Sequence, residues 1–157
     1  MFWTTSAGSI VRAGMDGSNR VSIAAHTSPS VKELRGIAID FQSSRLFWVS
    51  ANGEKIQSSN MDGGDVQTIL TVPSGSWPVG IGIFGDRIYW TGHNSKMVKS
   101  CTKTGQDVQT LYTGTGSPLH LAIVPEIYPP TVRTNDCEKL SCSKVCVLTP
   151  TSSRCLV

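Results

Sequence analysis

Apolar residues alternate with small or polar residues in short runs through most of the first 125 positions. In the run 36–40, for example, Ile37 and Ile39 alternate with smaller neighbours, a pattern that predicts a half-buried β-strand. Asp-Gly and Asn-Gly pairs such as Asp16-Gly17 and Asn52-Gly53 separate the runs, and these pairs favour the positive φ angles of tight hairpins. Because helical periodicity is nearly absent, the pattern predicts an all-β protein.

The predicted strands form groups that repeat along the chain. An opening group has three strands, two complete groups have four, and one lone strand follows them. The predicted strands span residues 2–5, 9–13 and 20–24; then 36–40, 45–50, 55–60 and 66–71; then 79–84, 87–92, 97–102 and 108–113; and finally 119–124.

Sequence motifs return at the same place in each group. An aromatic residue followed by tryptophan opens the chain and recurs twice, so that Trp3, Trp48 and Trp90 lie 45 and 42 residues apart. The tetrapeptide Asp65–Thr68 returns letter for letter at Asp107–Thr110. A fixed period near 42 residues with strand-like content is typical of the blades of a β-propeller.

The combination of motifs resembles the YWTD repeat, also called the LDL-receptor class B repeat. The resemblance is carried by the aromatic-Trp pairs, by the Met-Asp-Gly turns at 15–17 and 61–63, and by the run Pro78–Ile83. It implies a partial six-bladed β-propeller with about three blades, spanning residues 1–125. The aspartate that ends the family motif is replaced here, by Thr5, Ser50 and Gly92.

Composition and charge narrow the possible partners. The chain has 14 Lys and Arg against 11 Asp and Glu, and a scattered net charge of +3 is too small to predict nucleic-acid binding. No stretch approaches the roughly 20 apolar residues of a membrane-spanning helix, so we expect no direct membrane insertion. Since repeat sequence follows Met1 at once and only part of a propeller is present, we expect the chain to be a fragment or short product of a larger protein.

Four of the five cysteines lie close together near the C-terminus. Such density in a segment with little apolar core indicates a disulfide framework and an oxidising compartment, and four cysteines allow three pairings. The spacing resembles the start of the EGF-like module that follows YWTD propellers, here truncated at 137–157 after a Pro-containing linker at 126–136. The resemblance implies bridges between Cys137 and Cys146 and between Cys142 and Cys155.

The remaining chemistry-bearing residues predict neither an enzyme nor a cofactor. His26, His93 and His120 fall in different groups, with no acid or nucleophile at a known spacing. For Cys101, on a predicted strand, we expect a buried free thiol, with an intermolecular disulfide as the alternative. Asn135-Asp136 partly matches the acidic run of calcium-binding EGF modules, and calcium is kept there as a minor alternative.

Two sets of residues are candidates for packing and for binding. Aromatic residues that recur in every unit are expected to pack blade on blade: Trp3, Trp48, Trp90, Phe47 and Tyr89. Trp77 has no aromatic counterpart, since Glu33 and Ser117 stand at its position in the other units. The loops expected on its side of the disc define a candidate protein-binding face formed by Trp77 with Lys32, Glu33, Arg35, Asn52, Glu54, His93 and Asn94.

The resemblance implies a non-catalytic extracellular module, with protein ligands on the propeller face and with neighbouring blades and EGF modules as structural partners. We expect a fragment of an LDL-receptor-related, single-pass membrane receptor that serves in ligand binding, endocytosis or Wnt co-reception, outside the plasma membrane or in the endosome lumen. The alternative is a secreted or extracellular-matrix protein of the nidogen or EGF-precursor type. An enzyme would need convergent polar residues at the disc centre, where the predicted inner strands carry Ile, Ala, Gly and Leu.

Overall fold

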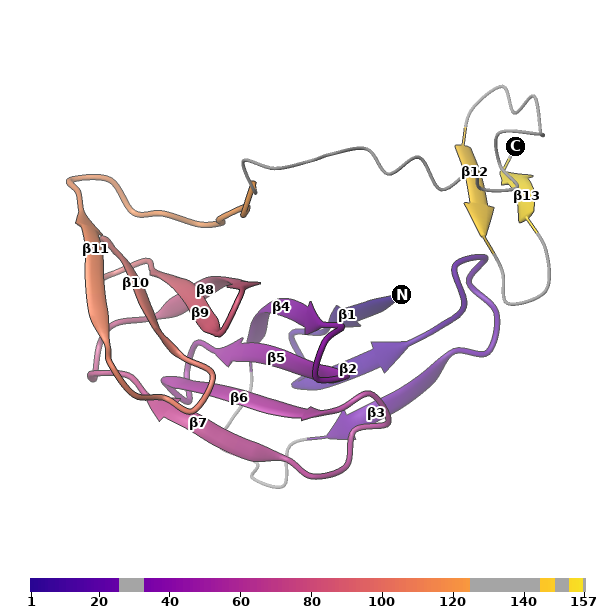
Figure 1. The fold of residues 1–157 in the computed structure, drawn as a ribbon, viewed down its shortest axis with the longest axis horizontal. Helices are drawn as coiled ribbons and strands as arrows, with labels where there is room; N and C mark the ends of the chain where they lie inside the picture. The colour runs from indigo at the N-terminus through magenta and orange to yellow at the C-terminus, as the bar shows by residue number, and fades with distance from the viewer. Residues whose placement is uncertain (26–32, 125–144, 149–152, 157) are drawn as a thin grey trace. The chain divides into compact units, whose positions relative to one another are not determined.

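The computed structural model describes residues 1–25, 33–124, 145–148 and 153–156, and all regular elements in these ranges are β-strands (Figure 1). The predicted all-β class is confirmed. Among the described residues no helix is long and apolar enough to cross a membrane. The chain divides into two compact units: one holds residues 2–11 and 22–123, and the other holds residue 1, 12–21 and 124–157.

Two four-stranded antiparallel meanders make up most of the first unit (Figure 1). They follow the predicted groups, with strand bounds that differ from the predicted ones by no more than two residues. Blade 2 consists of β4 (Leu34–Asp40), β5 (Arg45–Ser50), β6 (Lys55–Asn60) and β7 (Gln67–Thr71). Blade 3 consists of β8 (Pro78–Phe84), β9 (Arg87–Gly92), β10 (Met97–Thr102) and β11 (Gln109–Thr113).

The opening strands form a three-stranded sheet, which we call blade 1. Its strands β1 (Phe2–Thr4), β2 (Ser9–Arg12) and β3 (Val21–Ala25) lie in that order, so β1 is an edge strand of this sheet. In blades 2 and 3 the strands equivalent to β1, namely β5 and β9, are instead flanked by the first strands β4 and β8. Blade 1 therefore has the three outer strands of a blade and lacks the inner one among the described residues.

The prediction of a strand at 119–124 is wrong, because these residues belong to none of the described sheets. The segment nevertheless lies beside β8: a Cβ added to Gly80 would be 3.1 Å from His120 Cα, and one added to Gly82 would be 2.9 Å from Leu121 Cδ1. A strand needs a hydrogen-bonded neighbour, and no described segment pairs with this one. The segment thus lies where the inner strand of a following blade would lie, but it has no strand hydrogen bonds to a described neighbour.

The C-terminal part that is described is a short hairpin of β12 (Val145–Leu148) and β13 (Ser153–Leu156). Its register places Cys146 opposite Cys155. The other two partners of the predicted bridges, Cys137 and Cys142, lie outside the described residues, so the pairing stays a prediction.

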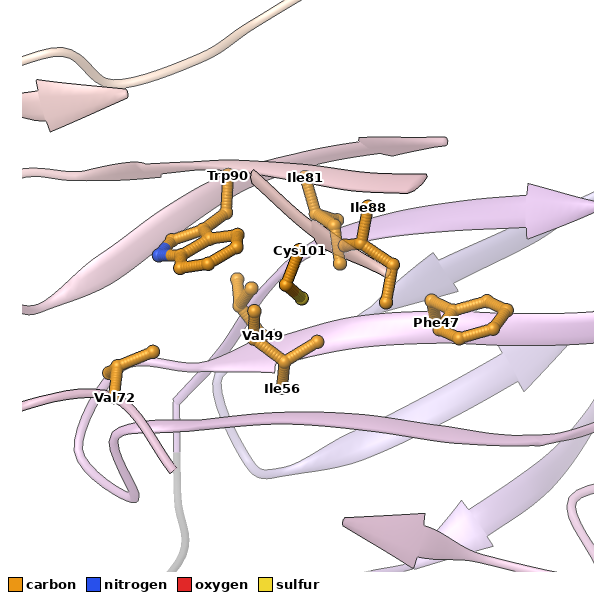
Figure 2. Packing of buried hydrophobic residues seen from close by; sticks show 8 residues of the cluster. All are labelled: Phe47, Val49, Ile56, Val72, Ile81, Ile88, Trp90 and Cys101. Carbon is orange, nitrogen blue, oxygen red and sulfur yellow. The ribbon is translucent and has the colours of Figure 1, made fainter. Parts of the chain in front are cut away.

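Apolar side chains fill the interfaces between blades. Between blades 2 and 3, Phe47, Val49 and Ile56 face Ile81, Ile88, Trp90 and Cys101 (Figure 2). Between blades 1 and 2, Ile10 packs with Leu34, Leu46 and Trp48. Successive strand residues point to opposite faces, and Phe47 and Trp48 accordingly belong to different interfaces. Both faces of β5 are therefore apolar, because each is covered by a neighbouring blade.

The inner strands β4 and β8 approach one another closely. Each carries a register irregularity, between Leu34 and Ile37 in β4 and between Pro78 and Ile81 in β8. A Cβ on Gly36, inside the first irregularity, would lie 2.6 Å from the carbonyl oxygen of Val79 on the neighbouring inner strand. The Gly-Ile-x-Ile run of the sequence is thus explained by the room that the next blade requires.

Candidate functional site

The loops that the sequence places on one face of the disc are joined by backbone hydrogen bonds. The Ala51 amide donates to the Glu33 carbonyl (3.1 Å), and the His93 amide donates to the Trp77 carbonyl (2.9 Å). The Gly75 amide also donates to the carboxylate of Glu54. The first two bonds connect, within blades 2 and 3, the loop that leads into the inner strand with the loop between the second and third strands. The Gly75 bond joins the loop between β5 and β6 of blade 2 to the loop that leads into β8 of blade 3.

Trp77 is held in an unusual backbone conformation. Its φ of 51° is in the left-handed region, which costs a non-glycine residue roughly 1–2 kcal/mol. Glu33, at the equivalent position of blade 2, has a φ of 66°, so the conformation belongs to the geometry of this loop rather than to tryptophan. A bulky side chain is nevertheless presented there, half-buried, in a conformation that bulky residues avoid.

Beside Trp77 lies an open depression with a volume of about 410 Å³. Four of its lining residues belong to the predicted face, and two more were not predicted; together they are Arg35, Trp77, His93 and Asn94, with Val79 and Leu119. Three of the lining residues stand at equivalent positions of successive units, two residues before the apolar runs that begin at Ile37, Ile81 and Leu121: Arg35, Val79 and Leu119. This repeat position is the signal by which the two missing residues could have been found.

The depression has mixed chemistry. Arg35 is exposed, and its guanidinium lies 3.8 Å from the Glu33 carboxylate, a surface pair of small energetic value. Within the described part of the chain, Nδ1 of His93 is buried and has no hydrogen-bond partner. Val79 and Leu119 add apolar surface. The site therefore combines a cationic group, a polar ring nitrogen and an aromatic wall.

The other predicted face residues lie away from the depression or beyond the described chain. Asn52 is exposed and Glu54 is occupied by the Gly75 amide, and neither lines the depression. Lys32 lies outside the described residues. Of the predicted face, four residues line the depression: Arg35, Trp77, His93 and Asn94.

The recurring aromatic residues are buried to different degrees. Trp48, Trp90 and Phe47 are almost fully buried between blades, whereas Trp3 and Tyr89 are half-buried. Trp48 faces the preceding blade and Phe47 the following one. By equivalence Trp3 and Tyr89 face the two outer sides of the three-blade set, where the described residues supply no further blade.

An arginine clamp explains the repeated Asp-Val-Gln-Thr motif, and sequence reasoning missed it. Arg45 donates to Asp65 Oδ2 at 2.6 Å and to the Ser58 hydroxyl at 3.0 Å. In blade 3 the corresponding distances from Arg87 to Asp107 and Ser100 are 2.7 and 3.0 Å. The hydrogen bond from arginine is the main reason why the pKa of Asp65 and that of Asp107 are lowered. The motif is thus structural.

The three replacements of the motif aspartate are accommodated locally. The Ser50 hydroxyl accepts a hydrogen bond from the Gly53 amide, and the Thr5 hydroxyl accepts one from the Ser9 amide, both at 3.1 Å. At Gly92 the Ser95 hydroxyl lies 2.1 Å from the place of an added Cβ and so occupies the side-chain space. The turns after these strands therefore form without the aspartate.

Cys101 is a buried free thiol, as expected from the sequence. Burial raises its pKa to about 11, which keeps it protonated at neutral pH. Within the ranges that the structure describes, no three His, Cys, Asp or Glu side chains gather to hold a metal ion.

Comparison with known proteins gives partial matches. No family model matches the chain. It is 28% identical over 100 residues to low-density lipoprotein receptor-related protein 1 of Pyricularia oryzae, which covers 53% of this chain and 32% of that protein. It is 38% identical over 76 residues to protein cueball of Drosophila ananassae, covering 45% of this chain and 11% of that protein. The chain thus spans a third or less of these curated relatives.

Solved structures share the fold. A chain of the nidogen/laminin complex matches with a TM-score of 0.67 and 24% identity, over 76% of this chain and 46% of that one. Virginiamycin B lyase of Staphylococcus aureus matches with a TM-score of 0.62 and 16% identity, over 77% of this chain and 41% of that one. The resemblance of the blades to LDL-receptor-related YWTD repeats is confirmed by these comparisons, whereas the EGF-like part is untested.

Proposed function

Because the chain carries propeller blades of the LDL-receptor-related kind, we propose that it is a non-catalytic, extracellular binding segment that holds a protein ligand at the depression beside Trp77. The observation that carries this proposal is the half-buried Trp77, held at a φ of 51° over an open depression. Tryptophan and arginine are the residue types most enriched at binding hot spots.

The lining of the depression favours a ligand segment with an apolar side chain next to a carboxylate. The indole of Trp77 and the side chains of Val79 and Leu119 offer apolar contact, and Arg35 offers a positive charge. The nidogen/laminin neighbour, a complex of two proteins, supports a protein as the ligand. The fold itself does not decide the matter, since enzymes such as virginiamycin B lyase share it.

The same proposal extends to the setting of the chain. The dense cysteines at 137–157 support an oxidising compartment. We place the segment in the ectodomain of a membrane receptor, and a secreted or matrix protein is the alternative. A membrane-spanning segment in the full-length protein would separate the two, and endocytic or Wnt-related roles depend on the ligand found.

The proposal is tested by capture of proteins from extracellular fluid on the immobilised chain, followed by titration of each captured protein. We expect a protein that binds the wild type and the Phe84→Ala variant, in which an exposed apolar residue at the far end of β8 is removed. Trp77→Ala should weaken its binding by roughly 2 kcal/mol or more, about 30-fold, if Trp77 is a hot spot.

Stability measurements separate loss of binding from loss of folding. Trp77→Ala should leave the melting temperature nearly unchanged, whereas Trp48→Ala removes a ring buried between blades and should cost about 3–5 kcal/mol. If the captured proteins bind Trp77→Ala as well as they bind the wild type, the binding surface is elsewhere. If Trp77→Ala unfolds while Trp48→Ala does not, the assignment of packing and recognition residues is wrong.

A further inference from the structure

The loop at residues 72–77, here called the Trp77 loop, is held by three hydrogen bonds from other described segments. At its start the Val72 amide donates to the Glu54 carbonyl at 2.8 Å. In its middle the Gly75 amide donates to the Glu54 carboxylate. At its end the Trp77 carbonyl accepts a hydrogen bond of 2.9 Å from the loop between β9 and β10. One residue of blade 2, Glu54, therefore provides two of the three bonds to the loop that leads into blade 3.

A tight turn inside the Trp77 loop leaves the Gly75 amide available to an outside partner. The amide and the hydroxyl of Ser76 both donate to the Pro73 carbonyl, at 3.1 and 2.5 Å, and close a four-residue turn. Gly75 is the third residue of this turn, and its φ of 79° is one that glycine adopts readily. The hydrogen bond that closes such a turn does not use the amide of the third residue. The Glu54 carboxylate therefore binds the turn at its unused donor.

The equivalent positions of the other blades lack this side-chain contact. Gly8, Glu54 and Lys96 stand directly before β2, β6 and β10, and all three have a positive φ, of 86°, 49° and 55°. The Lys96 carbonyl accepts from the Gly114 amide at 2.9 Å, as the Glu54 carbonyl accepts from Val72. The backbone bond is thus a repeated feature of the blades. Glycine has no side chain and lysine has no side-chain acceptor, so the carboxylate bond is an addition of blade 2.

We propose that Glu54 is a positioning residue for the depression: its carboxylate fixes the turn at Gly75 and thereby keeps Trp77 in the conformation that lines the depression. The inference rests on the proposed function of the depression, which Glu54 itself does not line. A left-handed φ is unfavourable for a bulky residue, so surrounding contacts must maintain the 51° of Trp77. Gly75 lies two residues before Trp77, and a hydrogen bond to a carboxylate is stronger than one between neutral groups. Without this bond the loop samples other conformations, and the fraction of chains ready to bind falls.

NMR spectra of the ligand-free 157-residue chain test the positioning directly. The indole N–H signal of Trp77 is assigned by its absence from the spectrum of Trp77→Ala. Glu54→Ala should speed hydrogen exchange of the Gly75 amide by about 10-fold and shift the Trp77 indole signal. Glu54→Gln keeps an oxygen acceptor and should restore most of both, whereas Lys96→Ala, at the equivalent position of blade 3, should leave both unchanged. Unchanged Gly75 exchange or an unshifted Trp77 signal in Glu54→Ala would overturn the proposal.

Binding of the captured protein separates positioning from a general effect on stability. Glu54→Ala should weaken binding by about 10-fold, while unshifted indole signals of the buried Trp48 and Trp90 show that the blades remain folded. In a Trp77→Ala chain, Glu54→Ala should cause no further loss, because both substitutions then remove the same contact.

The outcomes distinguish this inference from the proposed function. Equal loss in both backgrounds, or full-strength binding by Glu54→Ala beside weakened binding by Trp77→Ala, refutes the positioning role and leaves the proposed function standing. If Trp77→Ala binds as well as the wild type while the NMR changes occur, the proposed function fails and the hold of Glu54 on the Trp77 loop is supported.

Discussion

Adding one methyl group at Gly36 should separate neighbouring blades. In Gly36→Ala the new Cβ would lie 2.6 Å from the Val79 carbonyl oxygen and 2.9 Å from the Ile81 amide nitrogen. Both are backbone atoms of β8, so relief requires the whole inner strand to shift, together with Ile81, which packs between blades 2 and 3.

The magnitude follows from two opposing terms. Overpacking of a well-packed site typically costs about 1–3 kcal/mol. Alanine also has fewer conformations than glycine in the unfolded chain, and this stabilises the fold by about 0.4–1 kcal/mol where the native backbone conformation suits alanine. Gly116→Ala isolates this second term, because an added Cβ there has no neighbour within 4 Å among the described residues. We therefore expect Gly36→Ala to be less stable than Gly116→Ala by about 1–3 kcal/mol.

Urea unfolding followed by tryptophan fluorescence measures the difference, because the buried Trp48 and Trp90 report on both blade interfaces. Gly80→Ala provides an intermediate case. Its Cβ would meet the Thr91 hydroxyl oxygen at 3.0 Å, and His120 Cα and the Leu121 amide nitrogen at 3.1 Å each, which are all longer than the Gly36 contacts. The expected order of stability is Gly116→Ala, then Gly80→Ala, then Gly36→Ala. Equal stability of the first and last variants would refute the close approach of the inner strands.

Two further predictions concern ionisable groups. Burial of Asp40 acts to raise its pKa, but hydrogen bonds from Lys103 and Ser43 outweigh burial and lower the pKa. The unfolded chain therefore binds more protons near the ordinary pKa of aspartate, and the Asp40–Lys103 pair stabilises the fold above about pH 4. Lys103→Ala should therefore lower the free energy of unfolding by about 1–3 kcal/mol near pH 7. Urea unfolding should show this loss shrinking as pH falls through the lowered pKa of Asp40. A loss of the same size at acid pH would contradict the prediction. Cys101, buried and with a pKa of about 11, should resist alkylation until the protein is denatured. Mass spectrometry of secreted protein alkylated without reduction reads this directly, and labelling of all five cysteines would contradict the extracellular assignment.

Most of the strands, their grouping into blades and the inter-blade positions of Phe47, Trp48 and Trp90 were predictable from the sequence alone. These features are local or periodic: alternation sets which residues face a neighbour, Asp-Gly and Asn-Gly pairs mark turns, and Trp48 and Trp90 recur because each blade needs the same contact. The bounds of β5, β6, β9 and β10 agree with the predicted ones for this reason.

The tertiary structure alone decided features that depend on what a segment meets. Residues 119–124 have strand-like alternation, yet they are not a strand because no described segment offers hydrogen-bond partners. The clamp of Arg45 on Asp65 joins residues 20 positions apart, a distance over which neither the local pattern nor the repeat names a partner. Val79 and Leu119 enter the depression beside Trp77 because consecutive blades bring equivalent positions together. Periodicity shows that positions are equivalent; packing determines which of them remain open to a ligand.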